Sequence, residues 1–324
     1  MTGIDIKEFS VHNSRFTILK ILKQAEEKFR MSGVPNPRLD AEALLSRVLD
    51  IDRVGLYTQY ERILSEEEVN NFFGLVERRN KREPLQYILG NTEFFGLEFV
   101  VTPDVLIPRP ETEILVEKAL NRVKSYELGV MSKNKKNSKL RTPDSELKIL
   151  DLCTGSGCIA VTLAKEIEGV KVYGVDISAK ALRVAKENAR RHEVEERIRF
   201  IQGNLFESFT IHCSRITDHG FRFDLIVSNP PYIPSSEINF LQEEVKDYEP
   251  REALDGGNNG LSYLKRIIKE APDYLKSGGS LLLEIGYKQK ERVFEIAEER
   301  EIYQTPVIIN DFAGIERVVK LNIR

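Results

Sequence analysis

Short β-rich runs alternate with helical patterns along most of the chain, from about residue 114 onward. This alternation predicts a mostly parallel, doubly wound α/β sheet, because each helix carries the chain back so that the next strand runs parallel to the last. The predicted strands cover residues 149–152, 170–175, 198–201, 225–227, 280–285, about 305–309 and about 317–321. Such sheets bind ligands at the carboxyl ends of their strands, so the residues that follow these runs are the candidates for a functional site.

The first 83 residues carry helical periodicity only. A first helix has one apolar face, made of Ile18, Leu19, Leu22, Ala25 and Phe29. A second helix follows two prolines. We expect its inward-facing residues to be Leu39, Ala43, Leu44 and Val48. Ser65 and Glu68 form a capping-box pattern that opens a third helix. None of these segments carries a chemical motif, so the pattern predicts a small helical bundle that grips a partner.

Residues 84–107 show a different pattern, without helical periodicity. Apolar residues surround Gly90 and Gly96, and they are Tyr87, Ile88, Phe94, Phe95, Leu97, Phe99 and Val101. This pattern predicts short strands with turns, a β-hairpin that joins two domains. We therefore expect a helical substrate-binding domain over residues 1–83, a β-hairpin linker over 84–107 and a catalytic domain over 108–324.

Composition argues against several classes of protein. The 324 residues include three cysteines, which excludes a disulfide scaffold and is typical of a reducing compartment. The net charge of −3 argues against a dedicated nucleic-acid binder, and no apolar run approaches the ~18 residues of a membrane span. Residues 133–141 hold five basic residues and are expected to form a solvated loop, and residues 211–222 a polar insertion. The start of the chain shows no signal or transit pattern, so we expect a cytoplasmic protein, and a monomer.

A glycine-containing turn follows the first strand of the predicted sheet, with the sequence Asp151-Leu-Cys-Thr-Gly155-Ser-Gly157. Glycine lets the backbone turn sharply and lets a ligand approach where a Cβ would stand. Asp176 ends the next strand, 19 residues after Gly157, where an acidic side chain can accept hydrogen bonds from ribose hydroxyls. Together these residues predict a site for a nucleoside-containing cofactor. The candidate contacts in the turn are Asp151, Cys153, Thr154, Gly155, Ser156 and Gly157.

Two kinds of cofactor fit this turn. The spacing of Gly155, Gly157 and Ala160 also matches the dinucleotide fingerprint, so an NAD(P)-dependent enzyme is an alternative. Asp151 favours a different ligand, because a carboxylate beside the turn would repel a pyrophosphate at the helix N-terminus. A cofactor with a positive end and no phosphate, such as S-adenosylmethionine, suits that charge better.

A second motif, Asn229-Pro230-Pro231-Tyr232, follows the fourth predicted strand. The two prolines remove backbone donors, which leaves the Asn229 carboxamide oxygen and the Pro230 carbonyl as acceptors. These acceptors can take both hydrogens of a planar –NH2 group, and the Tyr232 ring offers a face on which that group can stack. The four residues are therefore the candidate catalytic residues, and the predicted substrate carries an amide or exocyclic –NH2 group.

The combination resembles the amino-methyltransferases, which carry an (Asn/Asp)-Pro-Pro-(Tyr/Phe/Trp) element. Three segments, residues 107–113, 229–234 and 248–257, are similar to the PrmC/HemK family, the N5-glutamine methyltransferases of peptide chain release factors. The resemblance covers nearly the whole chain. It implies a Rossmann-like class I methyltransferase domain and methyl transfer from S-adenosylmethionine to the glutamine of the Gly-Gly-Gln motif. The products would be S-adenosylhomocysteine and a methylated release factor.

The same resemblance implies roles for single residues. Gly155 and Gly157 would line the methionine part of the cofactor, Asp176 would hold the ribose, and Asn204 and Leu205 would lie near the adenine. Two positions depart from the family pattern: Cys153 stands where many such turns have their first glycine, and Leu205 where an aromatic residue could sit. The sequence does not identify a general base.

Several alternatives stay open at this point. An adenine-N6 nucleic-acid methyltransferase would share the Asn-Pro-Pro-Tyr chemistry, but it would need a basic groove. A non-catalytic binding module would not need the intact motif. Arg109 with Glu111, and Glu249 with Arg251, could order the site or form plain ion pairs. The four histidines show no ligand spacing and the cysteines lack the second pair of a zinc site, so no metal is expected.

Overall fold

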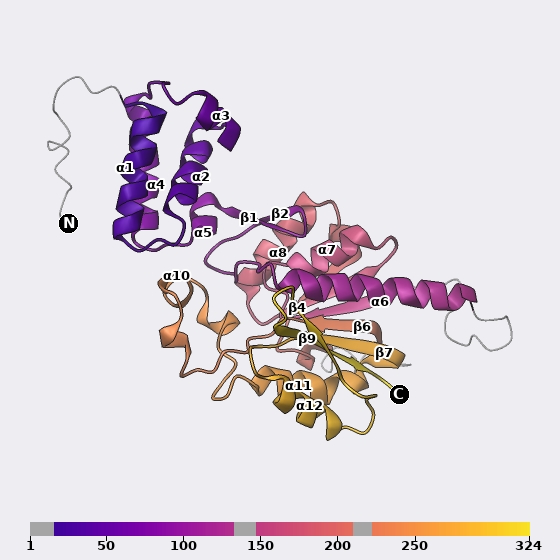
Figure 1. Ribbon diagram of the computed structural model, residues 1–324. Coiled ribbons are helices and arrows are strands. Elements are labelled where there is room, and N and C mark those ends of the chain that lie inside the picture. Colours follow the sequence, from indigo (N-terminus) through magenta and orange to yellow (C-terminus); the bar gives the residue numbers. More distant parts are fainter. Residues whose placement is uncertain (1–15, 133–146, 210–221) are drawn as a thin grey trace. The chain divides into compact units, whose positions relative to one another are not determined.

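The computed structural model describes residues 16–132, 147–209 and 222–324. The chain divides into two compact units, Met1–Leu89 and Gly90–Arg324 (Figure 1). The predicted basic loop at residues 133–141 lies outside the described residues, and so do residues 211–221 of the predicted polar insertion. Each unit is considered by itself.

The first unit is helical where it is described. Its helices are α1 (Ile18–Met31), α2 (Pro37–Leu49), α3 (Arg53–Thr58), α4 (Glu66–Asn80) and α5 (Leu85–Leu89). The predicted capping box is present, since the Ser65 side chain accepts from the Glu68 N–H and the Glu68 carboxylate accepts from the Ser65 N–H. Apolar faces of α1, α2 and α4 share one core, with Leu22, Leu44 and Phe72 fully buried.

The buried face of α2 differs from the predicted one. Leu39 is 47% exposed, whereas Asp40 and Glu42 are buried beside Leu44. Both carboxylates face arginines: Asp40 pairs with Arg79 at 2.7 Å, and Glu42 with Arg38 and Arg53. Apolar periodicity places charges on the surface and so misses a helix that turns paired charges inward.

A short hairpin opens the second unit. Strands β1 (Asn91–Phe94) and β2 (Leu97–Val100) pair antiparallel, and both Phe95 and Gly96 have positive φ, as a tight two-residue turn requires. The predicted hairpin is therefore present. The strand prediction for Tyr87 and Ile88 is wrong, because both lie in α5. Pro84 precedes that helix and Gly90 follows it with φ of 82°, which are the usual signals for a helix start and stop.

The predicted doubly wound sheet is confirmed. Its strands are β3 (Lys148–Leu152), β4 (Lys171–Asp176), β5 (Ile198–Gln202), β6 (Phe223–Ser228), β7 (Leu275–Glu284), β8 (Val307–Asn310) and β9 (Glu316–Asn322). Their order is β5-β4-β3-β6-β7-β9-β8, with β9 antiparallel to both of its neighbours. The chain order reverses between β3 and β6, so the carboxyl ends of these two strands form the crevice in which such sheets bind ligands.

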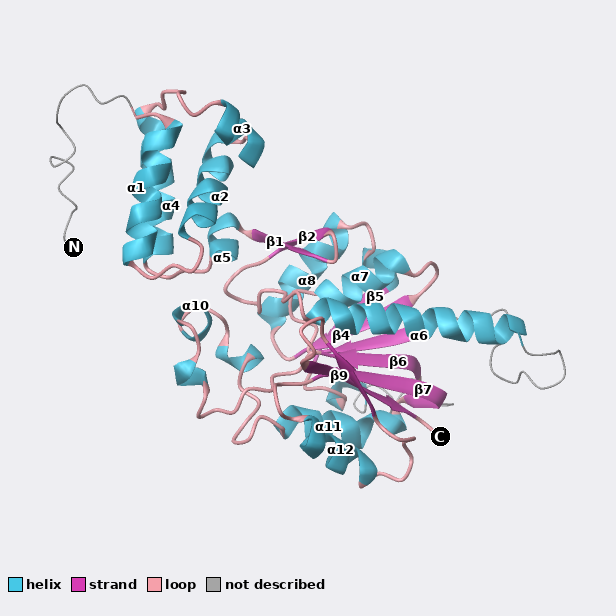
Figure 2. Ribbon diagram, viewed as in Figure 1, coloured by secondary structure: helices cyan, strands magenta, loops and turns pink. Residues whose placement is uncertain are grey.

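Helices cover both faces of the sheet (Figure 2). Helices α6 (Thr112–Ser132), α7 (Cys158–Glu166) and α8 (Ala179–Arg191) pack on one face, and α11 (Ser262–Glu270) and α12 (Lys290–Glu298) on the other. Alternate residues of β6 feed the two cores, since Leu225 and Val227 belong to the first and Ile226 to the second. The short elements are η2 (Glu195–Arg197), η3 (Ile238–Phe240), α10 (Glu243–Lys246), η4 (Arg251–Ala253) and η5 (Ala271–Asp273). Among the described helices, none has the length and apolar character needed to cross a membrane.

Candidate active site

The turn between β3 and α7 uses its two glycines for different reasons. Both have positive φ, 54° at Gly155 and 80° at Gly157. A Cβ at Gly155 would meet no atom within 4 Å, and this residue lines a cavity. A Cβ at Gly157 would approach the Ala185 Cβ to 3.0 Å. Gly155 therefore leaves room for a ligand, whereas Gly157 lets α7 pack closely on α8.

Cys153 and Leu205, the two departures from the family pattern, share an unusual backbone conformation. Their φ angles are 59° and 56°, in the left-handed region that glycine occupies without strain. Burial, with a contribution from the nearby Asp176 charge, raises the pKa of the Cys153 thiol. A protonated thiol is a poor nucleophile, so Cys153 is a wall residue of the turn.

Asp151 lies behind the turn rather than in the cavity. It is fully buried, and its Oδ2 accepts a hydrogen bond of 2.5 Å from the Thr154 hydroxyl. Its Oδ1 has no hydrogen-bond partner among the described residues. Burial raises the pKa of Asp151 to about 7, and the Thr154 hydrogen bond opposes that shift. Asp151 therefore braces the turn from within the core.

Asp176 ends β4 and joins the turn to α8. Its Oδ2 accepts from the Gly155 N–H at 2.8 Å, and its Oδ1 accepts from the Ser178 N–H at 2.9 Å. Burial raises the pKa of Asp176, and these backbone hydrogen bonds oppose the rise. The carboxylate is thus fixed at the cavity wall, with acceptor capacity left for a ligand.

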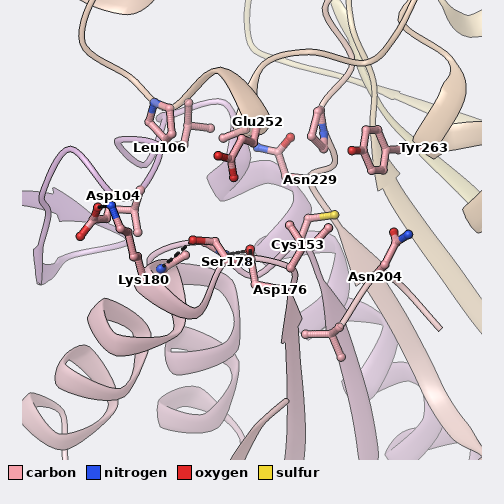
Figure 3. Close-up of a pocket in the computed structure, with 18 of the residues that line it drawn as sticks. Asp104, Leu106, Cys153, Asp176, Ser178, Lys180, Asn204, Asn229, Glu252 and Tyr263 are labelled. Carbon is pink, nitrogen blue, oxygen red and sulfur yellow. Dashed lines mark hydrogen bonds and ion pairs between the residues drawn. The ribbon is translucent and has the colours of Figure 1, made fainter. Parts of the chain in front are cut away.

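These residues surround a cavity of about 270 Å³ (Figure 3). Of the predicted cofactor contacts, those that line it are Cys153, Gly155, Asp176, Asn204, Leu205 and Asn229. Four others, Asp151, Thr154, Ser156 and Gly157, are not among the lining residues. Leu106 and Glu252 lie across the cavity from Asp176 and Ser178.

Asn229 lies at the border of this cavity and a second pocket of about 90 Å³, because it lines both, as Leu106 and Ala253 also do. The second pocket also contains Pro230 and Tyr232 in its wall. Asn229 Nδ2 donates a 3.1 Å hydrogen bond to Thr112 Oγ1 at the start of α6. The amide nitrogen is therefore engaged by the protein, and the carboxamide oxygen is the atom left to accept from a ligand.

Tyr232 is held from behind. Its hydroxyl donates to Glu284 Oε1 at 3.2 Å, and its carbonyl accepts from Gln289 Nε2 at 2.9 Å. Glu284 ends β7 and is 1% exposed. Burial raises the pKa of Glu284 to about 7, and hydrogen bonds with Thr112 and Tyr232 oppose that shift.

The residues of the two candidate ion pairs combine in an unexpected way. Arg109 pairs with Glu249 at 2.5 Å, and Glu249 is buried, whereas Arg251 pairs with Asp255 at 3.2 Å. Burial raises the pKa of Glu249, and the Arg109 charge opposes the rise. The Arg109–Glu249 pair thus ties the segment before α6 to the segment after α10, next to the smaller pocket that Arg109 lines.

Comparisons with known proteins bear on this site. Residues 20–90 match the family model of the PrmC N-terminal domain, and residues 143–319 match that of a methyltransferase domain. The release factor glutamine methyltransferase of Geobacter sulfurreducens is 44% identical over 304 residues, which cover 94% of this chain and 96% of that protein. That of Fusobacterium nucleatum is 38% identical and covers 97% of this chain and 79% of that protein. The chain belongs to the release factor glutamine methyltransferase family.

A solved structure bears on the fold of this family member. The hMettl16 catalytic domain, in complex with MAT2A 3′UTR hairpin 6, aligns over 79% of this chain and 82% of that chain. The TM-score is 0.51 and the sequence identity is 13%, so the likeness concerns the fold alone. The predicted Rossmann-like methyltransferase fold and the resemblance to the PrmC/HemK family are confirmed.

Several site residues of this release factor glutamine methyltransferase family member escaped the sequence reasoning. The cavity wall includes Asp104, Lys180 and Tyr263, which come from three segments without a motif, and Glu252, which lies in the segment 248–257 but was not singled out there. Asp104 and Lys180 form a 3.5 Å ion pair. Glu284 did carry a signal, because a glutamate directly after the apolar run Leu281–Leu283 is a candidate buried charge.

No metal centre emerges within residues 16–132, 147–209 and 222–324, where no group of three or more His, Cys, Asp or Glu side chains could hold an ion. Cys153 and Cys158 are free thiols. The His192 ring contacts Phe99, and its Nε2 lies 2.8 Å from the Glu98 carbonyl oxygen. The other three histidines, His12, His212 and His219, lie outside the described residues.

Proposed function

We propose that this protein methylates the side-chain amide nitrogen (N5) of the glutamine in the Gly-Gly-Gln motif of peptide chain release factors. S-adenosylmethionine is the proposed methyl donor and S-adenosylhomocysteine the product. The observation that carries the proposal is the placement of Asn229: it lines both cavities, and its amide nitrogen is already bonded to Thr112. The proposal assigns to this chain the activity for which its relatives are named, since both are release factor glutamine methyltransferases.

The larger cavity fits the proposed donor. The open space at the missing Cβ of Gly155 gives a ligand close access to the backbone. Asp176 and Glu252 contribute carboxylates to the cavity wall. These negatively charged acceptors favour a cationic ligand with ribose hydroxyls over a pyrophosphate. When bound, S-adenosylmethionine supplies an electrophilic methyl group. Gly155, Asp176, Asn204 and Leu205 would hold it.

The chain's own task is to position the amide nitrogen, which is a poor nucleophile. The Asn229 carboxamide oxygen and the Pro230 carbonyl accept the two N–H groups of the glutamine amide. These hydrogen bonds align the nitrogen and strengthen as positive charge develops on it. The smaller pocket, beside Tyr232, shields the amide from water. No base is needed at the moment of transfer, because the N-methylated amide cation loses its proton readily.

The remaining parts of the proposal concern the partner and the setting. We propose that the helical unit grips the release factor while the second unit performs the transfer. The enzyme would act as a monomer in the cytoplasm, where translation is terminated, and would form no stable complex with nucleic acid. Deletion of residues 1–83 should then spare donor binding and weaken methylation of the protein substrate.

Transfer of a labelled methyl group tests the substrate. Purified release factor, its Gly-Gly-Ala variant and duplex DNA are offered in parallel. Label on the wild-type release factor alone supports the proposal, and label on DNA would instead identify an adenine-N6 methyltransferase. Asn229→Ala should lower kcat by about 100-fold or more, as the loss of one transition-state hydrogen bond does elsewhere. Its affinity for S-adenosylhomocysteine, measured by calorimetry, should fall far less.

A pair of glycine variants tests the donor cavity. Gly155→Ala would place a Cβ at the cavity, and Gly169→Ala would place one in open space in the loop before β4. Both residues have positive φ, 54° and 68°, so both substitutions carry a similar backbone cost. Only Gly155→Ala should weaken binding of S-adenosylhomocysteine, by at least about 10-fold or 1.4 kcal/mol. Equal affinities of the two variants would contradict the placement of the donor.

A further inference from the structure

A buried hydrogen-bonded group lies behind the Asn229–Tyr232 motif and contains two side chains from outside it. Thr112, the first residue of α6, is 2% exposed and accepts from Asn229 Nδ2 at 3.1 Å. Glu284, the last residue of β7, accepts from the Tyr232 hydroxyl at 3.2 Å. Glu284 thus contacts one end of the motif, and Thr112 contacts the other end.

The carboxylate sets the direction of the hydrogen bonds. Because Thr112 Oγ1 already accepts from Asn229, the hydroxyl proton of Thr112 is left to donate. Glu284 Oε2 is buried and has no hydrogen-bond partner within 3.5 Å among the described residues, and the Thr112 hydroxyl is one of the groups that lower the pKa of Glu284. An ionised carboxylate only accepts, so it requires both Thr112 and Tyr232 to donate toward it.

We propose that Glu284 and Thr112 are positioning residues for methyl transfer, which keep the Asn229 carboxamide oxygen turned toward the substrate amide. This inference rests on the proposed function of Asn229. A neutral donor at position 284 would allow Thr112 to reverse its hydroxyl and donate to the Asn229 oxygen. The Asn229 amide would then present its NH2 to the NH2 of the substrate, and two donors cannot bond to each other.

The charged groups around Glu284 come from each element packed on it. Arg317 of β9 favours the carboxylate form, and Glu111, next to Thr112, opposes it. Cys158 of α7 also faces the Glu284 charge. Tyr232 faces Arg317 and Arg109 as well as Glu284. Burial outweighs the favourable partners and raises the pKa of Glu284 to about 7. The ordered, ionised form therefore gives way to a protonated form near neutral pH.

Two isosteric variants test the proposal. Glu284→Gln keeps the shape and supplies a donor, and Thr112→Val keeps the shape and removes the hydroxyl. Each should lower kcat by about 10- to 100-fold, the scale of a small misplacement of reacting groups. The KM for release factor should change less than about threefold, a modest change on the scale of a single contact. Thr112→Ser, which retains the hydroxyl, should restore most of kcat. In the double variant the losses should not add, because both residues act on the orientation of the same Asn229 amide.

The pH profile separates positioning from plain stability. The wild-type kcat should fall with decreasing pH through a single ionisation, and Glu284→Gln should lack that acid limb. Glu284→Gln should also melt at the same or a higher temperature at pH 8, because it removes a buried charge. Wild-type kcat in Glu284→Gln, or an unchanged acid limb, would overturn the proposal while leaving the function intact.

A failure of the proposed function would look different. Wild-type enzyme would then leave the release factor unlabelled, whatever the variants do. The same variants would be measured on the substrate that does take label, duplex DNA included. Full kcat of Glu284→Gln on that substrate would still overturn the positioning role.

Discussion

Buried carboxylates are held in two contrasting ways in the two units. In the helical unit, Asp40 faces Arg79, and Glu42 accepts from Arg38, Arg53 and the Tyr57 hydroxyl. Burial alone would raise the pKa of Glu42, but these hydrogen bonds lower it below the usual value. The buried carboxylates Asp40 and Glu42 of the helical unit are therefore neutralised by arginine side chains in direct contact with them.

Asp151 and Glu284 in the second unit have no such partner at contact distance. Their hydrogen bonds come from hydroxyl groups, Thr154 for one and Tyr232 for the other. Burial raises the pKa of each to about 7. The difference teaches that the helical unit uses buried charge for structure, whereas the second unit, which also contains the paired Glu249, keeps two incompletely compensated carboxylates behind its candidate site. Such groups mark functional sites, where strain and desolvation serve chemistry.

The largest effect should come from breaking a compensated pair. Asp40→Asn removes the carboxylate that faces the buried Arg79 and should lower the free energy of unfolding by about 3–5 kcal/mol. Asp151→Asn, which removes an uncompensated charge, should cost little at pH 8 or stabilise the protein. Urea denaturation followed by circular dichroism measures both. Similar losses of unfolding free energy in Asp40→Asn and Asp151→Asn would contradict the difference between a paired and an unpaired buried carboxylate.

A smaller effect should come from a buried polar residue of the second unit that is fully bonded. Asn188 Oδ1 accepts from the Val100 N–H, and its Nδ2 donates to the carbonyls of Val100 and Ser156. Asn188→Ala should cost about 2 kcal/mol, because it leaves buried backbone groups without partners. It should also weaken S-adenosylhomocysteine binding, since Ser156 belongs to the turn.

An exposed asparagine supplies the control for Asn188. Asn71 lies on the surface of α4 in the helical unit. Asn71→Ala should change the free energy of unfolding by less than about 0.5 kcal/mol, as surface substitutions do. If Asn188→Ala likewise left both the free energy of unfolding and the affinity for S-adenosylhomocysteine unchanged, the hydrogen bonds of Asn188 between hairpin and turn would contribute nothing to either.

The sequence could predict those parts of the site whose chemistry is local. Turn glycines, the acidic end of a strand and the Asn-Pro-Pro-Tyr acceptors each follow from the conformational and hydrogen-bonding limits of neighbouring residues. The supporting contacts join distant positions: Asn229 meets Thr112 across 117 residues, and Asn188 meets Val100 across 88. Nothing in a local pattern encodes such pairs. Likewise, the buried face of α2 cannot be read from its own pattern, because Asp40 and Glu42 also pair with arginines on other segments, Arg79 and Arg53.

The contributions of Asp151 and Glu42 to stability should depend on pH with opposite signs. The folded pKa of Asp151 is raised to about 7, so its favourable contribution is complete below the unfolded value of ~3.9 and is lost as pH rises through 7. From pH 5.5 to 6.5 the unfolding free energy of wild type should fall relative to Asp151→Asn by up to about 1.4 kcal/mol.

Glu42→Gln is the matched variant for this titration. The folded pKa of Glu42 is lowered, so its contribution is complete above the unfolded value and is lost only as pH falls through the folded one. Between pH 5.5 and 7.5, the difference between wild type and Glu42→Gln should therefore stay constant. A pH-independent Asp151→Asn difference would show that Asp151 is ionised across this range like an ordinary carboxylate.

The smallest effect concerns backbone strain, which both units contain. Cys153 in the turn and Asp50 at the end of α2 have φ angles of 59° and 51°. The left-handed conformation costs most residues roughly 1–2 kcal/mol, but aspartate tolerates it. Glycine removes that cost, but it destabilises the fold by about 0.5–1 kcal/mol because it gives the unfolded chain more conformational entropy. Cys153→Gly should therefore stabilise by about 0.5 kcal/mol, and Asp50→Gly should be neutral or slightly destabilising. A destabilised Cys153→Gly would mean that the thiol packs well enough to outweigh its strained backbone.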